Sequence, residues 1–268
     1  MHLLYTDETN RDPEQTDYFV YGGVSIDGSH SEALSFDIAK VRHDHGYRPE
    51  DLLKFNVAER PAHVSKEAHR DVKRAVMQVA AHHGVRLFAS MVLHALATSP
   101  DEARRFEINR VCFHFDCYLN RVKDTGLVLI DTFNDPQLPN LLREKFSIGL
   151  KNMPYSKSLR MKNILGYHLA SIGSSHFCSL IDIVLGAMRF AINNRNSNTR
   201  ERVVSELMAQ LSPLCYREGS DKVSELSLFF SPKSIKSPKF HTDYENLQKF
   251  FGRHGMTSGQ TILYTPTY

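Results

Sequence analysis

Short apolar segments alternate with longer amphipathic segments along most of this chain, and this alternation restricts the fold more than any other feature. β-Branched and aromatic residues predict strands at 3–6, 17–26, 85–93, 127–131 and 163–170. Apolar residues at helical spacing predict helices at 32–45, 65–83, 100–123, 138–150, 174–193 and 198–211. The order predicts an α/β fold: a mixed five-stranded sheet covered by helices, with a helical insert between the second and third strands.

Several boundaries have a local chemical cause. Ser65 and Ser99 are expected to cap the helices that follow them, and Pro100 suits a first helical position. Gly22 and Gly23 interrupt an otherwise strong strand, which predicts a bulge or a close approach of another segment.

Residues 1–211 are predicted to form the main domain, and residues 212–268 a C-terminal extension packed on it. Within the extension we expect a hairpin near 226–230, a basic surface loop at 231–240 and a helix at 244–254. There is no internal repeat and no obvious linker before about residue 212.

Composition excludes several classes of protein. The 268 residues are 41% hydrophobic and 24% charged, so the chain can bury a full core without disulfides. A net charge of +3 neither identifies nor excludes a nucleic-acid binder, because a local basic groove matters more than the total. The four cysteines form no C-x-x-C pair, which favours a reducing compartment over a disulfide framework or zinc site.

The sequence also limits location and chemistry. The N-terminus lacks a basic and apolar leader, and the apolar run 179–192 is short and interrupted by Asp182 and Arg189. We therefore expect a cytoplasmic protein that does not enter a membrane. No P-loop, H-E-x-x-H or G-x-S-x-G motif occurs, so the corresponding hydrolases are unsupported.

Acidic residues follow or interrupt apolar segments at three places. Asp7 and Glu8 end the first predicted strand, Asp131 ends the fourth, and Asp182 lies in an apolar helix. Strand alternation directs Asp7 and Glu8 to opposite faces, so Glu8 joins Asp7 only at a strand end or bulge. The alternative is structural: aspartates are common where strands turn into loops, and a helical aspartate often pairs with a neighbouring Arg or Lys.

The helix that contains Asp182 has one polar or small stripe at spacings of three and four. Its members are Ser175, Ser179, Asp182, Gly186, Arg189 and Asn193. Asp182 therefore faces something polar, and Gly186 would let a backbone or ligand approach the same face. If the acids of the separate elements converge, their repulsion requires a cation, and hard oxygen ligands select Mg²⁺ or Mn²⁺.

Five short motifs, in their order, resemble a known family. They are Y-T-D-E-T near the N-terminus, F-V-Y-G-G-V, L-L-K-F at 52–55, L-V-L-I-D, and S-L-I-D-I-V-L-G-A. Over roughly residues 1–195 the chain resembles domain of unknown function 3800, a bacterial and phage-borne family that looks RNase H-like. Asp243-Tyr244 is similar to the ending of that family, whereas Ser179 stands where its helix motif usually has Gln.

The resemblance implies an RNase H-like core with an acidic metal site. The family's acids fall on Asp7, Glu8, Asp131 and Asp182, which would bind Mg²⁺ or Mn²⁺, and its lysine falls on Lys54. Lys54 would contact a phosphate; the alternative is a solvated or ion-paired lysine. Glu107 and Asp116 are further candidate ligands, for which a solvated or paired role is the simpler interpretation.

The leading hypothesis is a metal-dependent phosphodiesterase that hydrolyses RNA or DNA through a metal-activated water. The second is a non-catalytic nucleic-acid- or protein-binding module of a defence or mobile-element system. A third is a toxin-like nuclease restrained by a protein antitoxin. The oligomeric state is left open.

Overall fold

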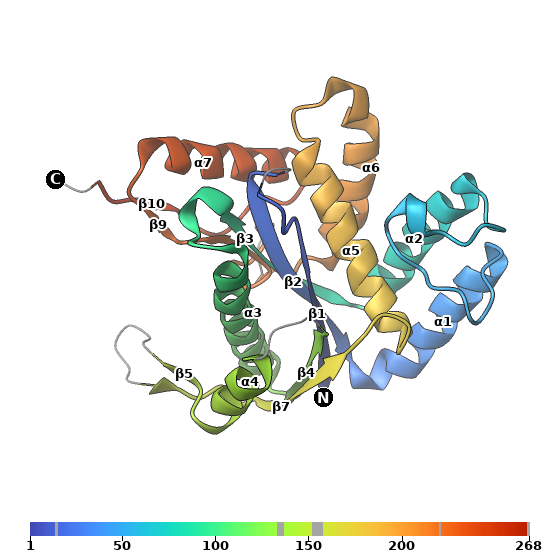
Figure 1. Ribbon diagram of the computed structural model, residues 1–268, viewed down its shortest axis with the longest axis horizontal. Helices are drawn as coiled ribbons and strands as arrows, with labels where there is room; N and C mark the ends of the chain where they lie inside the picture. Colours follow the sequence, from blue (N-terminus) through green and yellow to red (C-terminus); the bar gives the residue numbers. More distant parts are fainter. Residues whose placement is uncertain (14–15, 133–136, 152–157, 220, 267–268) are drawn as a thin grey trace.

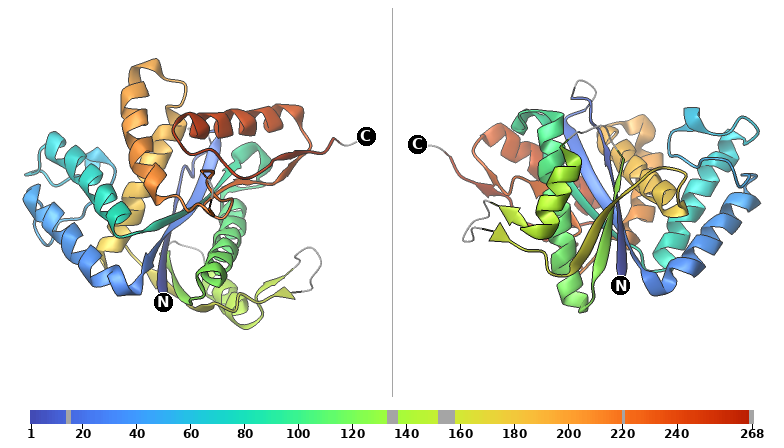
Figure 2. Two further views of the ribbon diagram at one scale, coloured as in Figure 1. Left: turned by 180° about the vertical axis from the view of Figure 1, so that it is seen from behind. Right: turned by 60° about the horizontal axis from the view of Figure 1, so that its bottom comes forward.

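The computed structural model describes residues 1–13, 16–132, 137–151, 158–219 and 221–266. A mixed sheet of six strands, in the order β7-β4-β1-β2-β3-β8, forms its centre, with helices on both faces (Figures 1 and 2). The strands are β1 (His2–Thr9), β2 (Tyr18–Asp27), β3 (Arg86–Leu93), β4 (Gly126–Asp131), β7 (Ile164–Ala170) and β8 (Leu228–Ser231). The predicted α/β class and mixed sheet are confirmed, but the sheet has six strands rather than five.

The directions of the strands bring the carboxyl ends of two of them together. β1, β2 and β3 form an antiparallel meander, whereas β4 runs parallel to β1 and β7 runs parallel to β4. The carboxyl ends of β1 and β4 therefore meet at the same edge of the sheet. This edge is where the predicted acids of both strands lie.

Helices cover both faces and divide the core in two. The helices are α1 (Ser31–Asp44), α2 (Lys66–His82), α3 (Pro100–Val122), α4 (Leu138–Ser147), α5 (His176–Asn193), α6 (Glu201–Leu211) and α7 (Pro238–Arg253). α5 packs on β1 and β2 and contacts α1, α2 and α6, whereas α3 packs on the meander from the opposite side (Figure 2). Each face has its own cluster of buried apolar side chains.

Local chemistry explains several boundaries. The Ser65 hydroxyl accepts a hydrogen bond from the Ala68 N–H, and Ser99 likewise caps α3, as predicted. The pairing of β2 with both neighbours is continuous through Gly22 and Gly23, so the predicted bulge is absent from it. The close approach is present instead, because a side chain at Gly22 would collide with Leu185 of α5.

The C-terminal segment differs from its prediction in two ways. Residues 226–230 form no hairpin with their neighbours; β8 pairs in parallel with β3 and is the sixth strand of the sheet. Residues 231–240 are not one long loop, because β9 (Ser234–Ile235) pairs with β10 (Leu263–Tyr264) and α7 begins at Pro238. The remaining short pair is β5 (Leu150–Lys151) with β6 (Ser158–Leu159).

Among the helices of the described ranges, α5 alone has the length and apolarity needed to cross a membrane. It is the central helix of one core, and 72% of the relevant stretch is buried inside the protein. Packing against the sheet therefore accounts for its apolar composition.

Candidate functional site

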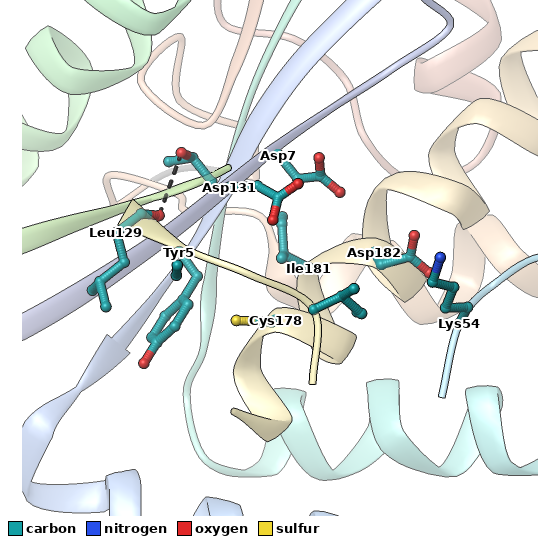
Figure 3. A pocket seen from close by; sticks show the side chains of 11 residues that line it. Tyr5, Asp7, Lys54, Leu129, Asp131, Cys178, Ile181 and Asp182 are labelled. Carbon is teal, nitrogen blue, oxygen red and sulfur yellow. Dashed lines mark hydrogen bonds between the residues drawn. The ribbon is translucent and has the colours of Figure 1, made fainter. Parts of the chain in front are cut away.

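The first part of the site is a pair of aspartates at the carboxyl edge of the sheet. The parallel register of β1 and β4 ends with Thr6 opposite Ile130, so the next residues, Asp7 and Asp131, are neighbours across the two strands. Residues opposite each other in a parallel pair direct their side chains to the same face. Figure 3 shows both carboxyl groups on the α5 side of the sheet.

α5 supplies the third acid. The Asp182 Oδ2 accepts a hydrogen bond of 2.6 Å from the backbone N–H of Phe55, in the connection between α1 and α2. A side chain at Gly186, one turn further along α5, would overlap the Phe55 ring. The 54–57 segment therefore packs against the predicted polar and small stripe of this helix. Asp182 accepts a hydrogen bond from the backbone of that segment rather than pairing with a neighbouring Arg or Lys.

These acids line one small pocket of about 100 Å³, with Lys54 and Cys178 among its other lining residues (Figure 3). Burial, together with the smaller effect of the Asp131 and Asp182 charges, raises the pKa of Asp7 to about 7. Burial also raises the pKa values of Asp131 and Asp182, and the Asp182 charge adds to the effect on Asp131. The pocket thus holds carboxyl groups that resist ionising together.

Lys54 enters the pocket from the 54–57 segment beside Asp182 (Figure 3). Its Nζ atom donates to Glu59 Oε2 at 2.5 Å, and this hydrogen bond is the main cause of its raised pKa. The Asp182 and Asp131 charges raise that pKa further. Lys54 is therefore ion-paired, as the alternative interpretation has it, and it also faces the acids.

Glu8 does not join this group. It follows Asp7 in an extended strand, so its side chain lies on the α3 side of the sheet, where Arg104 binds it at 3.2 Å. Arg104 is 2% exposed, and its charge opposes the effect of burial on the pKa of Glu8. The fourth predicted ligand is thus a partner of a buried arginine, because β1 has no bulge that would turn Glu8 toward Asp7.

Glu107 and Asp116 are also held elsewhere. Glu107 is buried on α3, where it accepts hydrogen bonds from Ser90, Ser231 and Arg110. Asp116 accepts a hydrogen bond of 2.8 Å from the backbone N–H of Asn163. Both acids are paired, as the simpler interpretation of the sequence has it.

The donor set fits Mg²⁺ or Mn²⁺ in its chemistry. Asp7, Asp131 and Asp182 offer hard oxygen atoms, and in the described ranges none of them forms an ion pair with a cationic side chain. In the described part of the chain, however, no group of three or more His, Cys, Asp or Glu side chains is gathered closely enough to hold an ion.

The sequence did not indicate the full lining of the site. Phe55 lies in the L-L-K-F motif, but that motif does not mark its backbone N–H as a hydrogen-bond donor, and Cys178 lies in none of the motifs. Arg189 was one member of the polar stripe on α5, and its charge acts on the pKa of Asp182. Asp135, which follows Asp131 in a polar segment, lies outside the described residues.

Comparisons with known proteins complete the description of the site. No protein-family model matches the chain, no curated protein matches it, and no solved structure matches it.

Proposed function

We propose that this protein is a Mg²⁺- or Mn²⁺-dependent nuclease that hydrolyses RNA or DNA at the pocket formed by Asp7, Asp131 and Asp182. The observation that carries the proposal is the convergence of three acids from β1, β4 and α5 on one pocket, without an ion-pair partner in the described ranges. Clustered carboxyl groups without a compensating cation are the expected arrangement of a divalent-metal site.

The fold supports the same proposal. The strand order β7-β4-β1-β2-β3 would be the RNase H-like core that the resemblance to domain of unknown function 3800 implies, with β8 as an addition. Membership in that family is part of the proposal and rests on the short motifs described above.

The size of the pocket limits what it can hold. About 100 Å³ is well below the roughly 300 Å³ at which pockets for whole small molecules begin, so it would take a phosphate group rather than a nucleobase. Asp7 and Asp131, held side by side by the strands, and Asp182, held by Phe55, would bind the cation. A divalent cation bound there would activate water and neutralise the developing charge.

The protein's own residues have separate tasks in this proposal. Lys54 would contact the phosphate, while Glu59 holds its ammonium group in place. The high pKa of Asp7 means that this carboxyl releases a proton when the cation binds near neutral pH.

The test is cleavage of single- and double-stranded RNA and DNA with Mg²⁺ or Mn²⁺, comparing wild type with Asp7→Asn, Asp131→Asn and Asp182→Asn. We expect each substitution to reduce cleavage by at least ~100-fold, because each removes charge at the cation. Glu8→Gln is the matched control, since it changes the adjacent carboxylate on the opposite face. Equal loss in Glu8→Gln, or unchanged cleavage in the three variants, would contradict the proposal.

A non-catalytic binding module is the second candidate. The observation that favours it is the absence, within the described residues, of a cluster already arranged to hold a metal ion. This alternative predicts nucleic-acid or protein binding that survives the aspartate substitutions. It also predicts that Mg²⁺ and Mn²⁺ leave the unfolding temperature of the wild-type protein unchanged, whereas a metal site predicts a rise.

A further inference from the structure

A second pocket is lined by the 54–57 segment, which also contributes Lys54 to the acidic pocket. Its volume is about 330 Å³, large enough for a ring system, which the acidic pocket is not. Its walls come from that segment, α2, α5 and α6. Apolar side chains predominate in the lining, namely Phe55, Val57, Phe190, Val203 and Leu207.

Among the residues that the structure describes, two cations at this pocket form no ion pair with an acid. The Lys73 Nζ atom lies 4.2 Å from the Phe55 ring centroid and donates to the Phe55 carbonyl oxygen at 2.9 Å. The Arg189 guanidinium lies 6.0 Å from the same centroid. In the part of the chain that the structure describes, neither forms an ion pair, whereas Arg74 and Arg202 both pair with Glu206.

Consecutive residues of the 54–57 segment line the two pockets. Lys54 lines the acidic pocket and the next residue, Phe55, lines the second one. On α5, Asp182 and Arg189 are seven residues apart, which places them on one face about 10 Å apart along the helix axis. An extended ligand that starts at the acids would therefore pass Arg189 and Lys73.

We propose that the second pocket binds one nucleotide of a single-stranded nucleic acid, next to the phosphate held at the acids. Lys73 and Arg189 would bind its phosphate, and the apolar walls with the Phe55 ring would hold its base. A base paired in a duplex cannot enter a pocket between helices, so the substrate would be single-stranded or locally unpaired. This inference rests on the nuclease proposal for the position of the neighbouring phosphate at the acids, but binding can be measured separately from cleavage.

Burial lowers the pKa of Lys73 to about 8, although the Asp182 charge opposes that shift. A partly buried ammonium group without a carboxylate partner is poorly stabilised in the free protein. A phosphate at this position would compensate it, which is consistent with an anion site.

The experiment measures binding of a fluorescently labelled single-stranded oligonucleotide and of the matching duplex, at low salt in EDTA. We expect wild type to prefer the single strand, and Lys73→Gln and Arg189→Gln each to weaken its binding about tenfold. Val203→Glu, which places an anion at the exposed rim of the pocket, is expected to weaken binding as well. Arg202→Gln is the matched control, because that side chain is 89% exposed and already paired.

The outcomes separate the two proposals. Weaker binding in Lys73→Gln and Arg189→Gln, without any cleavage by wild type, would support this pocket and reject the nuclease. Cleavage by wild type, with wild-type binding in both variants, would reject this pocket and leave the nuclease in place. Equal affinity for duplex and single strand, or no binding by wild type, would also overturn the inference.

Discussion

At the scale of single residues, adjacent acids in one strand have opposite environments. Asp7 faces two other aspartates, while Glu8 faces the buried Arg104. A cationic partner lowers the pKa of a buried acid, and acidic neighbours raise it. Burial raises the pKa of both acids, but Arg104 offsets part of the effect on Glu8, whereas the other aspartates add to the effect on Asp7.

This difference predicts how stability depends on pH. Because the pKa of Asp7 is about 7 in the folded state against 3.8 for the unperturbed group, its contribution is present at low pH and lost as pH rises through 7. In metal-free buffer at about pH 8, we expect Asp7→Asn to unfold with a free energy on the order of 2 kcal/mol higher than wild type. The difference should vanish below about pH 4.

Urea unfolding at several pH values measures this effect. Asp17→Asn, at a side chain that is 67% exposed, is the control and should change stability by less than about 0.5 kcal/mol at every pH. If the stability difference between Asp7→Asn and wild type does not change with pH, the pKa of Asp7 is not raised in the folded protein.

At the scale of elements, α5 positions the 54–57 segment through two contacts. Asp182 binds the Phe55 backbone N–H, and Gly186 leaves room for the Phe55 ring. The spacing of four residues along the helix puts both contacts on the same face. Lys54 is therefore placed at the acids, and Phe55 at the second pocket, by the same helix.

Gly186→Ala tests this placement. The added methyl group would overlap the Phe55 ring, so we expect a loss of about 1–3 kcal/mol of stability and displacement of Lys54 from the acids. The same change at Gly252 of α7 meets only Thr257 at 3.6 Å and should stabilise the protein by up to about 1 kcal/mol. Thermal unfolding and the cleavage assay measure both effects; equal behaviour of the two variants would refute the close packing at Gly186.

At the scale of the whole molecule, the C-terminal segment completes the sheet. β8 pairs with β3, and the Tyr244 hydroxyl of α7 accepts a hydrogen bond of 2.8 Å from the Leu93 N–H at the end of β3. Tyr244, Phe250 and Phe251 belong to the larger core. β8 and α7, which both follow residue 211, thus contribute to the sheet and to the core of the protein.

A chain that ends at residue 211 should therefore not fold cooperatively. It would leave the β3 edge unpaired and expose apolar side chains that α7 buries, which favours aggregation. Solubility and thermal unfolding measure the outcome. Tyr244→Phe is the milder comparison, expected to fold with a loss of about 1–3 kcal/mol from the unpaired Leu93 N–H. A soluble, cooperatively unfolding truncated chain would contradict this view.

Local patterns were sufficient for most elements. Ser65 and Ser99 predicted helix starts because capping involves only residues within one turn. The alternation of strand and helix predicted the α/β class, and the period of a strand already indicated that Asp7 and Glu8 diverge. The prediction of a hairpin near 226–230 is wrong because the partner of β8, β3, is distant in sequence, and a short apolar run does not specify its partner.

Spacing within single segments was enough to predict the helices, the main strands and the three acids. The shared pocket of Asp7, Asp131 and Asp182, the second pocket beyond Phe55 and the pairing of Glu8 with Arg104 could be found only in the folded chain. Those facts depend on strand register and on helix packing between segments more than a hundred residues apart. Such contacts form only when the whole sheet and both of its cores assemble together.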